Sequence, residues 1–212
     1  MDKIARKQRQ IPEFYDLSER LLNSGDACWG NLGYWKEGDD YSQACENLAH
    51  HLAGAINLDQ DSRVFDAGFG CGDQLLLWRK DYHVQFLCGI NYSISQTALA
   101  KIRVRQQDQP GSSDYLVQGD VADLKTCSAI NHKAVNKIVA LDCAYHFPSR
   151  EKFLCDSFQI LQQSNKNVQI LNEREVPAAR IGLTDIVLAQ PTLTWRKRWV
   201  LNVMLKFSRI PN

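Results

Sequence analysis

Hydrophobic residues in the middle of the chain fall into five short runs separated by longer amphipathic stretches. The runs are typical of buried strands and cover residues 62–70, 83–90, 114–118, 137–143 and 167–172. The stretches between them carry apolar residues at helical spacing and predict helices over 73–82, 93–107 and 149–163. Ser93 is a suitable N-cap for the second of these helices. Alternating strands and helices predict an α/β fold with a mostly parallel sheet and helices on both faces.

Two flanking segments differ from this alternating core. Residues 11–56 have a helical pattern interrupted by the aromatic, glycine-bearing run 29–35, and residues 177–207 have a mostly helical pattern broken at Pro191. We therefore divide one predicted domain into an N-terminal helical cap (1–56), a strand–helix core (57–175) and a helical C-terminal segment (176–212).

The composition excludes several classes of protein. Lys and Arg number 25 and Asp and Glu 24, so the net charge is +1 and a strongly basic nucleic-acid-binding protein is not expected. Hydrophobic residues make up 44% and charged residues 23%, which excludes wholesale disorder. No apolar run reaches the roughly 18–20 residues of a membrane span.

The chain has seven cysteines and no Cys-x-x-Cys pair, so neither a zinc site nor a disulfide framework is expected. Reduced, mostly buried thiols in a cytoplasmic protein are the simplest interpretation. The polar, basic residues 1–10 lack the apolar stretch of a secretory signal, and an organellar address there stays an alternative. His50 and His51 point to different sides of a helix, so we interpret them as structural and expect no metal.

The most informative local feature is the run DAGFGCG at residues 66–72, where the first predicted strand ends. Alternate glycines let the backbone turn tightly and let a ligand approach the main chain, and the following helix offers free N–H groups. Asp73 and Leu75 stand where a nicotinamide-binding fingerprint needs glycine, and the phosphate-loop pattern is absent. The turn therefore favours a cationic ligand without phosphates over a nucleotide, the alternative being a turn with no ligand.

Four motifs in this order resemble the class I S-adenosylmethionine-dependent methyltransferases. They are VFDAGFGCG at 64–72, GINYS at 89–93, GDV at 119–121 and LDCAYHF at 141–147. The upstream run WGNLGYW at 29–35 is similar to a segment of the subgroup that acts on sterols, tocopherols, quinones and other small natural products. The resemblance covers residues 11–175. It implies a Rossmann-like fold, S-adenosylmethionine as cofactor and a small-molecule acceptor.

The resemblance also assigns cofactor contacts. The amino-acid end of the cofactor would lie on the turn, against Asp66, Gly68, Gly70 and Gly72. Position 91 is usually acidic in the family and holds the ribose hydroxyls. Here Asn91, followed by Tyr92, keeps hydrogen-bonding capacity without charge, so ribose binding is expected to be weaker or supported elsewhere. The alternative is that Asn91 is only a turn residue.

Further contacts are expected from the third strand end and from the aromatic run. Asp120 would face the adenine amino group and Val121 the ring, or Asp120 would only cap a helix. Tyr34 and Trp35 would close over the methionine part, where an aromatic face attracts a sulfonium cation, or would only pack the N-terminal helices.

Methyl transfer from a sulfonium is an in-line displacement, so the protein positions the reactants and supplies a base for an O–H or N–H acceptor. His146, just past the fourth strand, is the first candidate base, because an unperturbed pKa near 6.5 suits neutral pH. Relatives that methylate hydroxyls often carry a histidine here. Tyr145 is the second candidate, and Asp142 would contact cofactor or substrate or cap the strand end. Alternatively, His146 only hydrogen-bonds a loop.

The family fold normally ends in two antiparallel strands after the fifth, but the 37 residues after Glu175 show no strand–turn–strand pattern. We expect the hairpin to be absent and residues 168–171 to form an exposed edge, open to a partner or a second copy. This pattern suits a shortened chain. The basic segment 195–209 is interpreted as a substrate lid, or as a helix that lies on a membrane surface or a partner.

Two hypotheses follow. The first is an S-adenosylmethionine-dependent methyltransferase that acts on a small, lipophilic acceptor at O, N or C. The alternative is a catalytically inactive relative that works through a binding partner. Methylation of nucleic acid is not supported, because an Asn-Pro-Pro-Tyr-like motif is absent and the charge is balanced.

Overall fold

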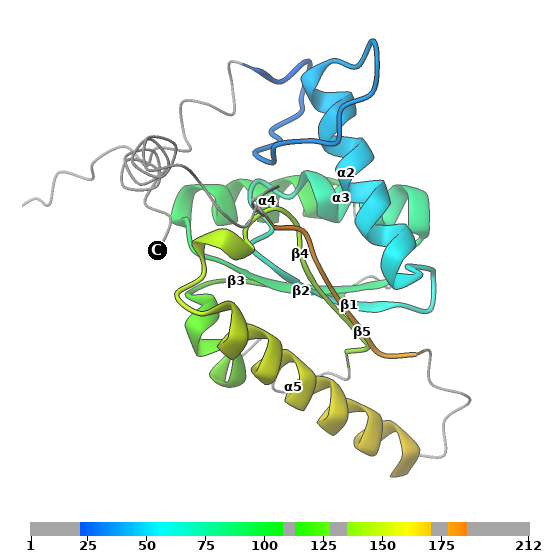
Figure 1. The fold of residues 1–212 in the computed structure, drawn as a ribbon, viewed down its shortest axis with the longest axis vertical. Coiled ribbons are helices and arrows are strands. Elements are labelled where there is room, and N and C mark those ends of the chain that lie inside the picture. The colour runs from blue at the N-terminus through cyan, green and yellow to red at the C-terminus, as the bar shows by residue number, and fades with distance from the viewer. Residues whose placement is uncertain (1–21, 108–112, 128–134, 171–177, 186–212) are drawn as a thin grey trace, which may run out of the picture.

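A parallel sheet forms the centre of the molecule (Figure 1). The computed structural model describes residues 22–107, 113–127, 135–170 and 178–185. Within these residues the sheet has five strands in the order β3-β2-β1-β4-β5, and every neighbouring pair is parallel. The strands are β1 (Arg63–Ala67), β2 (Phe86–Asn91), β3 (Ser113–Gln118), β4 (Lys137–Ala140) and β5 (Arg180–Leu183). The predicted α/β fold with a parallel sheet is therefore confirmed.

Helices cover both faces of this sheet (Figure 1). On one face lie α2 (Tyr41–Ile56), α3 (Asp73–Tyr82) and α4 (Ile94–Gln106). The other face carries α5 (Arg150–Ile170). Two short 3-10 helices, η1 (Val121–Thr126) and η2 (Ala144–His146), follow β3 and β4. None of the helices among the described residues is long and apolar enough to cross a bilayer.

The alternation of side chains along the strands sorts the apolar residues into two cores. Val64 and Leu87 belong to the core that packs on α2, α3 and α4, whereas Phe65 and Cys88 belong to the core on the α5 side. Trp78 of α3 is completely buried in the first core. Because both faces are covered, β2 and β4 are buried at every position and β1 at all but its first, which explains their continuous apolar runs.

Local sequence signals explain where the helices begin. Asp40 caps α2 through a reciprocal capping box with Gln43. Ser93 caps α4 as predicted, and its Oγ accepts a hydrogen bond from the Gln96 backbone N–H at 3.3 Å. Helix α3 has the predicted limits and begins directly after Gly72.

The prediction of the fifth strand is wrong. Residues 167–170, predicted as strand, are the last turn of α5, so they form no sheet edge. The fifth strand is instead β5, in a segment predicted to be helical. Gly182 in β5 lets α2 pack directly on it, since a Cβ there would collide with Ile56 and Leu52. Short apolar runs do not distinguish strand from helix, which explains the error.

The N-terminal part also departs from its prediction. Residues 23–40 are irregular instead of helical, and α2 is the first complete helix of the described residues. The expected absence of a terminal hairpin and the lid or membrane role of residues 195–209 concern segments outside the described residues. The three segments 1–56, 57–175 and 176–212 stay a prediction.

Candidate active site

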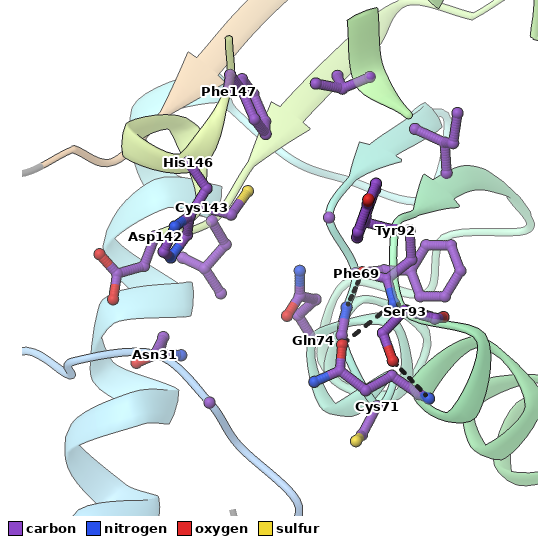
Figure 2. A pocket seen from close by; sticks show the side chains of 18 of the residues that line it. Asn31, Phe69, Cys71, Gln74, Tyr92, Ser93, Asp142, Cys143, His146 and Phe147 are labelled. Carbon is purple, nitrogen blue, oxygen red and sulfur yellow. Dashed lines mark hydrogen bonds between the residues drawn. The ribbon is translucent and has the colours of Figure 1, made fainter. Parts of the chain in front are cut away.

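A cavity of about 680 Å³ lies at the carboxyl ends of β1, β2, β3 and β4 (Figure 2). That volume is in the range of roughly 300–1,000 Å³ that is typical of small-molecule sites. The loops after these four strands and residues 28–31 of the N-terminal segment line it. Open parallel sheets bind ligands at this end of the strands, which is also where the four sequence motifs are located.

The glycine turn after β1 forms one wall. Gly68 has φ +83°, and a Cβ on it would lie 2.7 Å from Cys143 Sγ, so the turn packs tightly against the loop after β4. Gly70 has φ +55°, but nothing lies within 4 Å of the position its Cβ would occupy. Since Gly70 lines the cavity, that open space belongs to the site, and a side chain there would enter it.

Asp66 lies behind this wall and does not line the cavity. It is fully buried, and its carboxylate accepts hydrogen bonds from Gln74 Nε2 at 3.1 Å and Trp78 Nε1 at 3.0 Å. Burial raises the pKa of Asp66 to about 7, although these two bonds oppose the shift. Gln74 does line the cavity, so Asp66 can act on a ligand only by fixing its neighbours.

At the end of β2 the side chain of Asn91 is held by other protein groups. Its Oδ1 accepts the Gly70 N–H at 3.2 Å and its Nδ2 donates to Gln96 Oε1 at 3.2 Å. Asn91, Tyr92 and Gln96 all line the cavity. Gln96 was not predicted from the sequence, yet its buried amide adds hydrogen-bonding capacity beside Asn91.

The end of β3 supplies two of the predicted residues. Asp120 caps η1 and accepts the Ala122 N–H at 2.8 Å. Both Asp120 and Val121 line the cavity. The capping role and the place in the cavity wall are therefore compatible, because capping uses only one carboxylate oxygen.

Asp142, after β4, joins the cavity to the N-terminal segment. Asp142 has φ +51°, an uncommon backbone conformation for a non-glycine residue. Its Oδ2 accepts the Leu32 N–H at 2.5 Å, and its own N–H donates to Thr184 Oγ1 at 2.6 Å. Burial raises the pKa of Asp142 to about 6, and the hydrogen bond from the Leu32 N–H opposes this shift. The carboxylate therefore fixes residues 31–33 over the strand ends.

The two candidate bases lie next to Asp142 in η2. Tyr145 and His146 both line the cavity, and their ring centroids are 4.4 Å apart. Burial lowers the pKa of His146. A lowered pKa keeps the imidazole neutral at pH 7, the form that accepts a proton. The structure thus places both predicted bases at the cavity.

The aromatic run contributes differently from its prediction. Trp29 and Asn31 line the cavity, whereas Tyr34 and Trp35 do not. Tyr34 packs edge-on against His51 with centroids 4.2 Å apart, and Trp35 Nε1 donates to Leu32 O at 2.9 Å. The cavity-facing tryptophan is therefore Trp29.

Thiols and acids among the described residues provide no metal site. None of the seven cysteines forms a disulfide. The described residues contain no group of three or more His, Cys, Asp or Glu side chains arranged to hold a metal ion.

Comparison with known proteins places these features in context. No protein-family model matches the chain. Erythromycin 3''-O-methyltransferase from Saccharopolyspora erythraea is 26% identical over 133 residues, which are 62% of this chain and 42% of that protein. The chain thus spans less than half the length of this curated relative.

Solved structures share the fold. Coclaurine N-methyltransferase bound to N-methylheliamine and S-adenosylhomocysteine matches with a TM-score of 0.53 at 17% identity, over 69% of this chain and 40% of that one. The cyclopropane synthase MmaA2 from Mycobacterium tuberculosis matches with a TM-score of 0.51 at 20% identity, over 63% of this chain and 45% of that one. The cyclase SpnF matches with a TM-score of 0.54 at 21% identity, over 63% of this chain and 48% of that one.

The chain therefore has the fold of the class I S-adenosylmethionine-dependent methyltransferases, as its motifs predicted. A cyclase is among the proteins of this fold, so the activity has to be argued from the site.

Proposed function

We propose that the chain binds S-adenosylmethionine in this cavity and transfers its methyl group to a hydroxyl of a small-molecule acceptor. The observation that carries the proposal is the presence, in one cavity, of an open glycine turn and a half-buried histidine whose pKa is lowered by burial. The sequence relative, an O-methyltransferase, supports an oxygen acceptor.

The residues present suit the cofactor. Gly68 and Gly70 leave main chain exposed to the cavity beside the start of α3, where a ligand carboxylate is favoured by unpaired N–H groups. Gln96 and Ser93 supply uncharged polar groups for ribose hydroxyls near Asn91. Asp120 and Val121 supply an acceptor and an apolar surface for adenine. When bound, the cofactor supplies a methyl group already activated by a sulfonium charge.

The remaining steps belong to the chain's own residues. His146 accepts the acceptor's proton, because burial keeps its imidazole neutral. Trp29 and Asn31 cover the cavity and limit the entry of water, while Asp142 holds their segment through Leu32. Positioning and proton removal are what an already activated methyl donor requires of a protein.

A melting-temperature panel tests the proposal on the wild-type chain. The probes are S-adenosylhomocysteine, ATP and NAD, each at about 100 times a micromolar dissociation constant. S-adenosylhomocysteine is expected to raise the melting temperature by roughly 5–10 °C, from the free energy of binding and the unfolding entropy of a chain this size. The two phosphate-bearing probes are expected to cause no shift. Equal shifts with ATP or NAD would contradict the proposal.

A further inference from the structure

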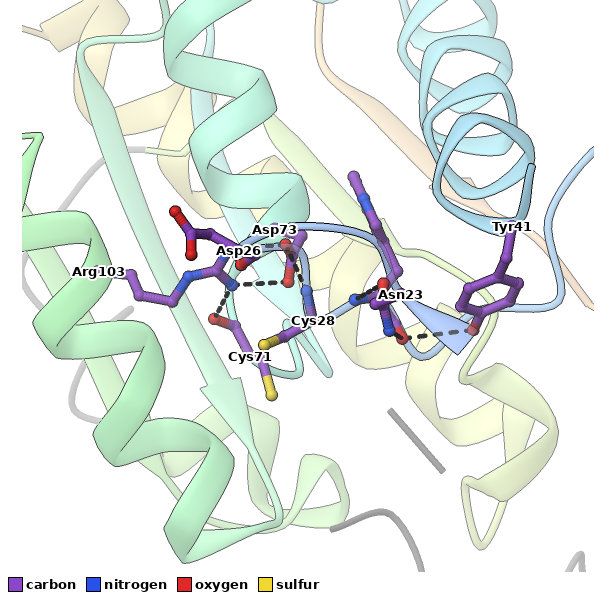
Figure 3. A network of polar contacts seen from close by, with 8 residues as sticks. Asn23, Asp26, Cys28, Tyr41, Cys71, Asp73 and Arg103 are labelled. Atoms are coloured by element: carbon purple, nitrogen blue, oxygen red, sulfur yellow. Dashed lines mark hydrogen bonds and ion pairs between the residues drawn. The ribbon is translucent and has the colours of Figure 1, made fainter. Parts of the chain in front are cut away.

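An ion pair away from the two candidate bases connects four parts of the chain (Figure 3). Arg103 of α4 and Asp73 in the first turn of α3 form a two-pronged pair, with Nη1 to Oδ2 at 2.7 Å and Nη2 to Oδ1 at 2.8 Å. Their side chains are only 15% and 7% exposed. A bidentate ion pair of this kind fixes the relative orientation of the two side chains and also stabilises the fold.

The same pair also holds main-chain groups of two other segments. Arg103 donates to the carbonyl oxygens of Cys71, in the glycine turn, and Asp26, each at 3.0 Å. Asp73 Oδ1 accepts the Cys28 N–H at 3.0 Å (Figure 3). One guanidinium therefore connects the turn to the segment 26–28, and a lysine could not make all these bonds.

The segment that begins at this ion pair leads directly over the cavity. Residues 28–31 line it, and Leu32 is fixed at the far side by Asp142. Residues 26–32, which we call the strap, are thus held at two ends by two carboxylates. Asp73 lines the cavity and Arg103 does not, so Arg103 can act on a ligand only through the positions of Asp73, the strap and the turn.

We propose that Arg103, acting through Asp73, is a positioning residue that holds the strap against the cavity and slows the release of its ligand. The proposed effect on ligand release rests on the proposed function, because the ligand in question is the cofactor. A purely structural ion pair would stabilise α3 and α4 without a selective effect on the strap.

Four variants separate these possibilities. Arg103→Met keeps the aliphatic part of the side chain and removes its charge and its hydrogen-bond donors. Arg103→Lys keeps the charge but cannot form the bidentate pair. Arg105→Met is the matched control, since Arg105 is exposed on the same helix and lies outside the cavity lining. Asp73→Asn keeps an acceptor for the Cys28 N–H and weakens the pair. Because Asp73 lines the cavity, this variant replaces Arg103→Met only in the exchange measurement if that variant does not fold, and Arg103→Lys then serves for the release rate.

The first readout is amide hydrogen exchange in the cofactor-free chain. In Arg103→Met, exchange at Cys28 is expected to rise about tenfold, in line with the loss of charge-assisted bonds. Leu32, held by Asp142, serves as the internal comparison and is expected to change less. Arg103→Lys is expected to be intermediate and Arg105→Met to match wild type. Unchanged exchange at Cys28, or an equal rise throughout α3 and α4, would overturn the proposal.

The second readout is the dissociation rate of S-adenosylhomocysteine, measured by stopped flow. Arg103→Met is expected to release it about tenfold faster, with Arg105→Met unchanged. Equal release rates in folded variants would overturn the effect on the ligand. If the wild-type chain binds no S-adenosylhomocysteine, the proposed function fails and the release effect with it, whereas the exchange result still decides whether Arg103 holds the strap.

Discussion

Asp66 offers the sharpest test of the electrostatics behind the glycine turn. The residue is fully buried, and burial raises its pKa from 3.8 to about 7. A raised pKa in the folded state means that folding favours the protonated carboxyl. Its stabilising contribution is therefore complete below pH 3.8 and is lost as the pH rises through about 7. The sign is opposite to that of an ordinary ion-paired carboxylate.

The size of the effect follows from the two pKa values. The gap between 3.8 and about 7 corresponds to roughly 4 kcal/mol of unfolding free energy in total. Somewhat more than half of this, about 2–3 kcal/mol, is lost between pH 5 and pH 8. Asp66→Asn cannot titrate and keeps one acceptor for Gln74 or Trp78. It loses one hydrogen bond, worth about 1 kcal/mol.

Urea unfolding of both proteins between pH 5 and pH 8 measures this difference. Other titrating groups cancel when the variant is compared with wild type at each pH. We expect the stability of Asp66→Asn relative to wild type to rise by about 2–3 kcal/mol from pH 5 to pH 8, with wild type more stable at pH 5. Parallel pH profiles for the two proteins would refute the reasoning.

Three other predictions concern the site, the strap and the packing of the fold. His146→Gln is expected to leave the affinity for S-adenosylhomocysteine within about twofold and to lower methyl transfer by ~10²–10⁴, measured with labelled S-adenosylmethionine against a screen of hydroxylated acceptors. Asp142→Ala leaves the Leu32 N–H without its carboxylate, so amide exchange at Leu32 should rise about tenfold; an unchanged rate would show that this bond does not hold the strap. Gly89→Ala places a Cβ 2.5 Å from a main-chain oxygen of β1 and is expected to lower the unfolding free energy by about 1–3 kcal/mol, whereas Gly54→Ala, with nothing within 4 Å, is expected to raise it. Urea titration compares the two glycine variants, and an equal effect would contradict the packing argument.

The parts of the fold that the sequence predicted correctly depend on local patterns. Strand–helix alternation and the glycine turn identified β1 to β4 and the helices α3 and α4, because both signals are contained in short windows. The fifth strand was missed because β5 is four residues long and follows a helix whose last turn is strand-like in composition. The pairing of β5 with β4 and the contact of Gly182 with α2 explain its place, and both contacts are tertiary.

The cavity-lining residues that the sequence predicted are those that lie at or just after the ends of strands. Asn91, Asp120 and His146 all line the cavity, because the carboxyl ends of parallel strands meet at one edge. Gln74 and Gln96 were missed since they lie on helices, where a single polar residue carries no distinctive pattern. Trp29, in place of Trp35, faces the cavity because Asp73 and Asp142 fix the strap, contacts that join residues 45 and 110 positions apart.

The cavity at the glycine turn is proposed to bind the cofactor. Calorimetric titration with S-adenosylhomocysteine tests it most directly when wild type is compared with Gly70→Asn and Gly25→Asn. The two glycines have similar φ values, +55° and +61°, which asparagine tolerates, and neither has a neighbour within 4 Å, but only Gly70 lines the cavity. We predict micromolar, one-to-one binding by wild type and Gly25→Asn and none by Gly70→Asn. No binding by the folded wild-type chain, or equal binding by both variants, would contradict the account.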